Sequence, residues 1–214
     1  MAASKTHSQV HGLGVALKNE PLTGLAAQLW SLRSAPALVK RKDGKYEGGI
    51  LGFVKGLRLS AGVIYYLKQK LSQTNLEVSW GHLLDHKEAS CSAECDVIVH
   101  SKGSVQKWNG TDHPIMEFKF VGIAQARAVI SCKSQLTSID KKYPEALKKF
   151  GVKKVFLFAE CCKATRFPKL RDAAKKAGYA DVCCLYLTDP TGGFVEVDER
   201  MYVDFGNKVL DAVK

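Results

Sequence analysis

The sequence predicts an α/β protein in which a central mixed β-sheet is flanked by helices. Between residues 126 and 189, apolar strand-like runs alternate with helix-like segments, which predicts parallel strands joined by right-handed crossovers. Between residues 76 and 123, strand-like runs are separated only by short turns, which predicts antiparallel pairing. A sheet with both kinds of pairing and with helices on its faces satisfies both patterns.

The N-terminal part is expected to hold an arm, a helix and a connector. Residues 1–20 are polar and contain glycine, so we expect a flexible arm ahead of a single domain that spans residues 21–214. A first helix is predicted for residues 21–39, with prolines near both ends. Residues 40–49 are basic and rich in glycine, and they are expected to form a loop.

A second, amphipathic helix is predicted for residues 56–71, because five apolar residues recur there at helical spacing. They are Leu57, Val63, Ile64, Leu67 and Leu71. Four strands are then expected, at residues 76–84, 95–101, within 108–123 after an Asn-Gly turn, and 126–133. The last of these runs is almost continuously apolar, so we place it in the centre of the sheet.

A short helix is predicted for residues 138–151, between the central strand and the next one. Thr137 and Asp140 resemble a capping box, Pro144 suits a first turn, and Gly151 marks the end.

The C-terminal part is expected to continue with strands at residues 152–162 and 181–189 around a helix at residues 167–179. One more strand, in the stretch GFVEVDERMYVDF, and a terminal helix complete the chain.

The composition favours an intracellular protein with a polyanionic partner. The formal net charge is +11, which points first to nucleic acid and second to an acidic membrane surface. No apolar run is long enough to span a membrane, and the N-terminus lacks the apolar core of a signal peptide, so we expect a cytoplasmic protein without a membrane partner. Seven cysteines, an odd number, lie mostly in apolar runs and are expected to be reduced core residues.

Polar side chains at the end of the central strand suggest a catalytic site. Ser131 and Lys133 are two residues apart and therefore share one face of the strand, with Cys132 on the other. Asp96 opens an earlier strand, and Glu145 lies in the first turn of the next helix. If these residues meet at one end of the sheet, the two carboxylates can hold Mg²⁺, and the lysine can orient or activate the attacking water.

Asp96 together with the stretch ISCK resembles the signature of the PD-(D/E)XK nuclease superfamily, in which an aspartate on one strand precedes Glu/Asp-x-Lys on the next. Ser131 occupies the acidic position, which departs from the common pattern. A subgroup of restriction endonucleases has Ser-x-Lys on this strand and takes the missing acid from the following helix. Glu145 could be that acid here, with Asp140 as a reserve. The resemblance covers about residues 57–160, roughly half of the chain.

This resemblance implies a restriction-endonuclease-like fold and hydrolysis of phosphodiester bonds with Mg²⁺ or Mn²⁺, in nucleic acid and by preference DNA. It also implies a role in restriction or antiviral defence. In the implied site Asp96 and Glu145 hold the metal, Lys133 positions or polarises water, and Ser131 hydrogen-bonds a metal-bound water.

A second placement of the motif uses Glu117 and Lys119, which follow Asp96 by about twenty residues and need no substitution. That stretch alternates like an exposed hairpin strand and leads into no helix, so we rank it second. Two further acids are weighed as helpers: Glu94 would share the strand face of Asp96, and Glu160 ends a buried strand. For Glu94 a solvated edge carboxylate is favoured, and for Glu160 a strand-terminal acid that pairs with a lysine.

Two other kinds of site are less favoured. A Ser/Lys hydrolase would need a glycine-rich oxyanion turn beside Ser131, and none follows. A zinc site can be drawn from Cys91 and Cys95 with the histidines at positions 82, 86 and 100, but the C-x3-C spacing is unusual and no second cysteine pair follows.

Basic residues on the second helix and in the connector are candidates for phosphate contacts: Arg58, Lys68, Lys40, Arg41 and Lys42. Because Ser131 replaces an acid, a nuclease-like domain that binds nucleic acid or acts as a scaffold without cutting is the main alternative. A protein-interaction subunit is a third reading. A homodimer and a partner subunit of a defence system are both left open.

Overall fold

A computed structural model of the chain describes residues 48–109, 117–191, 193–196 and 199–214. The expected arm at residues 1–20, the helix at residues 21–39 and the basic residues 40–42 lie outside this part, as does the turn at residues 110–116. No helix in the described residues is long and apolar enough to cross a membrane.

One mixed sheet contains all nine strands of the described residues, in the order β4-β5-β1-β3-β6-β7-β8-β9, with β2 paired to β1. This confirms the predicted sheet. The strands are β1 (Leu76–Asp85), β2 (Ser90–Cys91), β3 (Cys95–Ser101), β4 (Val105–Asn109), β5 (Glu117–Gly122), β6 (Ala126–Gln135), β7 (Val155–Lys163), β8 (Val182–Thr188) and β9 (Phe194–Glu196).

The direction of pairing changes across the sheet at β6. On one side, β1, β3 and β6 are antiparallel neighbours. On the other side, β6, β7 and β8 are parallel and are joined through α4 (Lys142–Lys149) and α5 (Phe167–Lys176). The exception to the expected antiparallel half is β5, which pairs in parallel with β1 because the β4–β5 hairpin attaches to the outer edge of β1. The strand that carries Ser131 and Lys133 is therefore central, as predicted.

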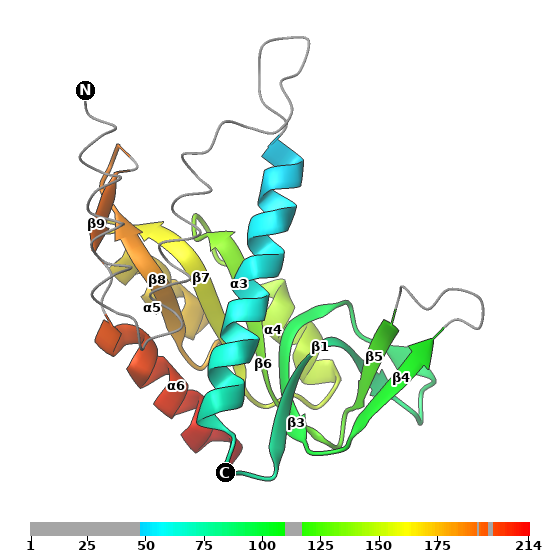
Figure 1. Cartoon of the computed structure of the whole chain (residues 1–214). Coiled ribbons are helices and arrows are strands. Elements are labelled where there is room, and N and C mark those ends of the chain that lie inside the picture. Colours follow the sequence, from blue (N-terminus) through cyan, green and yellow to red (C-terminus); the bar gives the residue numbers. More distant parts are fainter. Residues whose placement is uncertain (1–47, 110–116, 192, 197–198) are drawn as a thin grey trace.

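Helices cover both faces of the sheet (Figure 1). α3 (Gly48–Lys70) and α6 (Glu199–Val213) cover one face, while α4 and α5 cover the other. Two buried clusters, one on each face, alternate along the strands. On β6, Ala128 and Ile130 belong to the α3/α6 cluster and Val129 belongs to the α4/α5 cluster.

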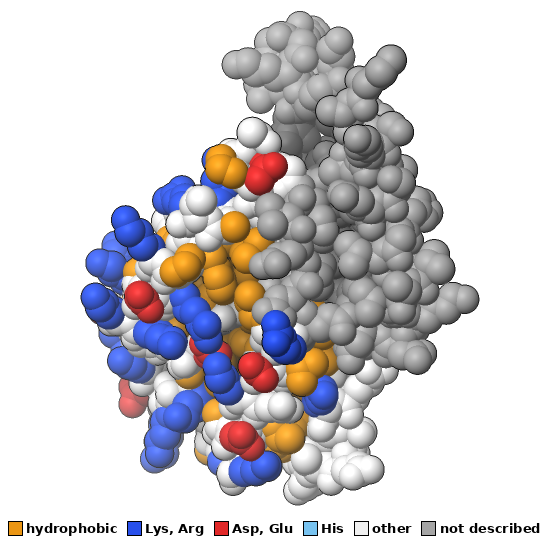
Figure 2. Space-filling model, turned by 90° about the vertical axis from the view of Figure 1, so that its left-hand side faces the viewer, with side chains coloured by type: hydrophobic (Ala, Val, Ile, Leu, Met, Phe, Trp, Pro, Cys, Tyr) orange, Lys and Arg blue, Asp and Glu red, His pale blue; other side chains and the backbone are white. Residues whose placement is uncertain are grey.

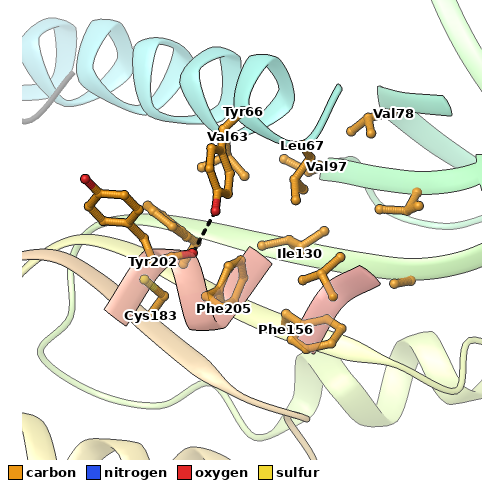
Figure 3. Packing of buried hydrophobic residues seen from close by; sticks show 14 of the residues in the cluster. Val63, Tyr66, Leu67, Val78, Val97, Ile130, Phe156, Cys183, Tyr202 and Phe205 are labelled. Carbon is orange, nitrogen blue, oxygen red and sulfur yellow. Dashed lines mark hydrogen bonds between the residues drawn. The ribbon is translucent and has the colours of Figure 1, made fainter. Parts of the chain in front are cut away.

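The α3/α6 cluster joins its two helices through aromatic contacts (Figure 3). The Tyr66 hydroxyl of α3 donates a hydrogen bond of 3.0 Å to the Tyr202 carbonyl of α6. Phe205 of α6 packs edge-on against Phe156 and Phe158 of β7, with ring centroids 5.6 and 5.3 Å apart. This packing fixes both helices against the central strands.

Three details differ from the sequence-based expectations. Leu57 is 55% exposed rather than buried, because it lies about 200° around the helix from Leu59, which is buried. α3 also begins eight residues earlier than expected. The expected strand after Gly193 is only three residues long, since its continuation forms the first turns of α6. The capping box does not form; Asp140 alone accepts backbone hydrogen bonds, from Lys142 at 3.0 Å and Tyr143 at 3.3 Å.

All seven cysteines are free, as expected, and five are buried. The adjacent pairs divide between the two faces: Cys161 and Cys183 belong to the α3/α6 cluster, and Cys162 and Cys184 belong to the α4/α5 cluster. They fill the core as small apolar side chains.

Candidate functional site

The structure places Asp96 directly against the end of the central strand. β3 and β6 pair antiparallel with Val97 opposite Ile130, so the next pair along the two strands is Asp96 and Ser131. The carboxylate of Asp96 accepts a hydrogen bond of 2.8 Å from the backbone N–H of Cys132. Asp96 therefore sits between the two residues of the Ser-x-Lys motif, although 35 residues separate it from Ser131 in the sequence.

Ser131 and Lys133 lie on the α4/α5 side of β6, and Cys132 points the other way. Val129, two residues before Ser131, belongs to the α4/α5 cluster, while Cys132 packs against the α3/α6 cluster. Ser131 is 1% exposed. Lys133 is exposed at the rim. The motif thus combines a nearly buried hydroxyl with an accessible ammonium group.

Burial raises the pKa of the Asp96 carboxyl above its ordinary value, and the negative charge of Glu94 adds to this rise. The hydrogen bond from Cys132 and the positive charge of Lys133 act in the opposite direction. Lys133 is therefore close enough to Asp96 for its charge to be felt. A cation that binds beside such a buried carboxylate stabilises its ionised form, because the charge of the cation offsets the lost hydration.

Tyr143 is a site residue that the sequence analysis missed. It lies in the first turn of α4, half-buried, and its hydroxyl is close to both the Cys95 thiol and the Asp96 carboxylate. Burial, with these two neighbours, raises the pKa of the Tyr143 phenol well above its usual value, so the phenol stays protonated. The signal available in the sequence was an aromatic residue next to Pro144, at the start of the helix that follows the strand of Ser131 and Lys133.

Glu94, rather than Glu145, is the carboxylate whose charge acts on Asp96. Glu145 is exposed on α4, two positions after Tyr143. Two positions on an α-helix correspond to about 200°, so Glu145 and Tyr143 lie on nearly opposite sides of the helix. The side of α4 that carries Tyr143 faces Asp96. The assignment of Glu145 as a metal ligand stays a prediction, and Glu94 becomes its competitor.

The alternative motif lies elsewhere in the sheet. Glu117 and Lys119 are on β5, which is separated from β3 by β1. β5 leads by a short turn into β6 rather than into a helix. The structure therefore brings Asp96 next to Ser131 and Lys133, whereas the whole width of β1 separates the strand of Asp96 from that of Glu117.

The other sequence candidates are accounted for structurally. Within the described residues, no three His, Cys, Asp or Glu side chains are grouped closely enough to hold a metal ion, so the zinc arrangement is not formed. Glu160 is fully buried on β7 and accepts a hydrogen bond from the Tyr186 hydroxyl. It shares its side of β7 with Phe156 and Phe158, in the α3/α6 cluster and away from Ser131.

The surface around α4 and α5 is strongly basic. Figure 2 faces the edge of the sheet where β8, β9, α5 and α6 lie, and it shows many Lys and Arg side chains on the described residues there, with acidic side chains scattered between them. We call this surface the basic face and define it by the exposed cations of these two helices and their N-terminal approaches: Lys141, Lys142, Lys148, Lys149, Arg166, Lys169, Lys175 and Lys176. Arg58 and Lys68, the sequence candidates, are exposed on α3 on the other side of the sheet.

Comparison with known proteins identifies the fold. No protein-family model and no curated protein matches the sequence. Solved structures do match, and they include NucC of P. aeruginosa ATCC27853 in its cAAA-bound form, with a TM-score of 0.56, and NucC of E. coli MS115-1 in its cAAA-bound form, with a TM-score of 0.54. Each is 11% identical, and each match covers 90% of this chain and 88% of the NucC chain. NucC has the α/β fold of PD-(D/E)XK nucleases, so the chain has the restriction-endonuclease-like fold that the motif implied.

Proposed function

We propose that this protein is a divalent-metal-dependent nuclease that hydrolyses phosphodiester bonds, with DNA as the first substrate to test. The observation that carries the proposal is the hydrogen bond between the Asp96 carboxylate and the Cys132 N–H. It fixes an acid between Ser131 and Lys133 at the end of the central strand. The same fold in NucC, a nuclease of anti-phage defence, supports a role in defence.

The residues present fit Mg²⁺ or Mn²⁺. Mg²⁺ is commonly held by one or two carboxylates together with waters and substrate phosphates, so a site with few protein ligands is adequate. Asp96 supplies one carboxylate, and Glu94 or Glu145 supplies the second. When bound, the ion would offset negative charge on the phosphate and assist ionisation of water.

The protein's own residues divide the remaining work. Lys133 extends from the rim and can contact a phosphate oxygen or orient the attacking water, where its positive charge stabilises the charge that develops during cleavage. The Ser131 hydroxyl, which can both donate and accept, would hydrogen-bond a water in the site. The Tyr143 phenol is near enough to Asp96 to feel its charge, and a largely buried ring at this place would help to keep bulk water from the carboxylate.

The basic face supports nucleic acid as the substrate. Its lysines form no ion pair with the described residues, so their charges are available to phosphates. The first residues of α4 and α5 follow directly from the strands β6 and β7, so Lys141, Lys142 and Arg166 lie toward the same end of the sheet as Lys133. A strand of nucleic acid could therefore contact these cations while its scissile phosphate reaches Asp96.

The decisive experiment compares cleavage of plasmid DNA, single-stranded DNA and RNA with Mg²⁺, with Mn²⁺ and with EDTA. We expect metal-dependent cleavage that Asp96→Asn and Lys133→Ala reduce by about 100-fold or more, as for other groups that stabilise developing charge. Lys87→Ala, which removes an exposed lysine from the β1–β2 turn, is the matched control and should cleave normally. Loss of activity in Glu117→Gln instead of Lys133→Ala would move the site to β5.

The rival proposal is a nuclease-like domain that binds nucleic acid without cutting it, and the serine at position 131 favours it. It predicts no cleavage with either metal, but binding that weakens steeply with salt. Absence of both cleavage and binding at low salt would reject the two proposals and favour a protein-interaction subunit.

A further inference from the structure

A cavity lies away from the Asp96 site, at the other end of β3. It has a volume of about 390 Å³, within the range of small-ligand sites. Its walls come from the end of α3, the start of β1, the end of β3 and the β4–β5 hairpin. Asp96 and His100 are four residues apart on β3, which corresponds to about 13 Å along an extended strand. The cavity is therefore separate from Asp96, Ser131 and Lys133, although Lys119 of the alternative motif lines it.

Two buried polar atoms at this cavity lack a hydrogen-bond partner among the described residues. They are the hydroxyl oxygen of Ser79, in a residue that is 8% exposed, and Nε2 of His100, which is fully buried. Both residues line the cavity. Leaving a buried polar atom unpaired costs roughly 1–3 kcal/mol, so two together at one cavity call for an explanation.

The neighbours of His100 determine what its free nitrogen can do. Nδ1 lies 2.9 Å from the Ser101 carbonyl oxygen and 2.9 Å from the Ser104 hydroxyl. A carbonyl only accepts, so Nδ1 carries the hydrogen. Burial lowers the pKa of the ring, although the Ser101 contact and the charge of Glu77 oppose this, and the imidazole is neutral at pH 7. Nε2 is therefore an acceptor that needs a donor.

The rim of the cavity is strongly positive. Four lysines line it, Lys68, Lys102, Lys107 and Lys119, against a single carboxylate, that of Glu77, among its described lining residues. Glu77 accepts a hydrogen bond of 3.2 Å from the N–H of Gly103. Lys68 and Lys102 form no ion pair with the described residues. This rim repels metal cations and attracts anions.

We propose that this cavity binds a nucleotide, with its phosphate among the lysines and a sugar hydroxyl or base amino group donating to His100. Ser79, which can both donate and accept, would take a second hydrogen bond from or to the same ligand. An anion without donors would leave His100 unsatisfied, so the lysines alone do not explain the site. The proposal stands whether or not the Asp96 site cuts.

The test is calorimetric titration of the full chain in EDTA with nucleoside 5′-monophosphates, the matching nucleosides and inorganic phosphate. We expect a nucleotide to bind more tightly than either fragment. Lys68→Ala should weaken nucleotide binding roughly tenfold, as loss of a charge-assisted contact does. Lys70→Ala is the matched control: Lys70 is in the same last turn of α3, but its ammonium lies over the Tyr66 ring, 5.6 Å from the centroid, and outside the cavity.

The Ser79→Ala variant tests the contribution of the polar interior to binding separately from that of the charged rim. Because it removes an unpaired buried hydroxyl, the variant should fold at least as well as the parent. It should bind inorganic phosphate unchanged and nucleotide more weakly. If a 5′-phosphorylated DNA strand displaces the bound nucleotide, the cavity holds part of the nucleic-acid substrate. If it does not, the cavity is a site for a free nucleotide. Either result supports the proposal. Nucleotide binding no tighter than phosphate binding, or equal losses in Lys68→Ala and Lys70→Ala, would overturn it.

Discussion

The ionised carboxylate of Asp96 destabilises the folded chain at neutral pH. Its pKa is raised mainly by burial, so the folded chain binds this proton more tightly than the unfolded chain does. Stability is then lost as pH rises from the ordinary aspartate value through the raised one. Asp96→Asn keeps an acceptor for the Cys132 N–H and removes the charge. We expect it to gain about 1 kcal/mol in free energy of unfolding at pH 7 while abolishing cleavage.

Urea unfolding in EDTA at several pH values checks this prediction. The gain of Asp96→Asn should shrink as pH is lowered, because the parent carboxyl becomes neutral too. Asp172→Asn, an exposed change on α5, is the control. An unchanged or lower stability of Asp96→Asn at pH 7 would mean that the hydrogen bond and Lys133 outweigh the burial of the charge.

The second metal carboxylate can be assigned by comparing Glu94→Gln with Glu145→Gln. The charge of Glu94 reaches Asp96, whereas Glu145 is exposed away from Tyr143. We therefore expect Glu94→Gln to weaken Mn²⁺ binding by about tenfold and to lower cleavage in proportion, and Glu145→Gln to leave both nearly unchanged. Titration of Mn²⁺ into each variant measures the difference. The reverse order would show that α4 supplies the migrated acid, as the sequence motif implied.

At the scale of elements, the close approach of α3 and α6 depends on a glycine. A Cβ on Gly206 of α6 would collide with the Tyr66 side chain, including its hydroxyl oxygen and, at 3.0 Å, Cζ. Gly206→Ala should therefore cost about 1–3 kcal/mol, because the two helices must separate and strain the Tyr66–Tyr202 hydrogen bond. The higher helix propensity of alanine does not compensate for this collision.

Gly56→Ala on α3 is the matched comparison. Nothing lies within 4 Å of its added Cβ, so the change should raise stability by roughly 0.5–1 kcal/mol through helix propensity alone. Thermal or urea unfolding of the two variants shows whether each change lowers or raises stability. Equal effects of the two substitutions would show that α3 and α6 tolerate a wider spacing.

The elements themselves were largely predictable from local patterns. Apolar strands and alternating helices at residues 126–189 predicted the parallel half, and short turns predicted β1, β3 and β6 as antiparallel neighbours. Two features were not predictable. β5 pairs with β1 in parallel, which only the path of a whole hairpin determines. Tyr143 comes near Asp96 only when α4 folds onto the sheet, and this proximity joins residues 47 positions apart in the sequence.

At the scale of the molecule, one buried carboxylate connects helices from both faces of the sheet. Asp181 precedes β8 and is 4% exposed. It binds Arg171 of α5 at 3.3 Å and Lys208 of α6 at 2.6 Å. Burial alone would raise its pKa, but these cations and the N–H of Val182 outweigh burial and hold the pKa below its ordinary value. The two helix layers are thereby linked at one end of the sheet.

Removing this carboxylate should leave two cations near the surface and loosen both layers. We expect Asp181→Asn to cost about 2–3 kcal/mol at pH 7, below the largest values for buried pairs because Arg171 and Lys208 are partly exposed. A lowered pKa gives stability that is present above the ordinary value of 3.8 and lost as pH falls through the folded-state pKa. The difference in free energy of unfolding between parent and variant should therefore close in acid.

Urea unfolding at pH 7 and below pH 4 measures this difference, with Asp211→Asn on the exposed end of α6 as control. A gap that persists in acid would show that Asp181 acts through its shape and hydrogen bonds rather than through its charge.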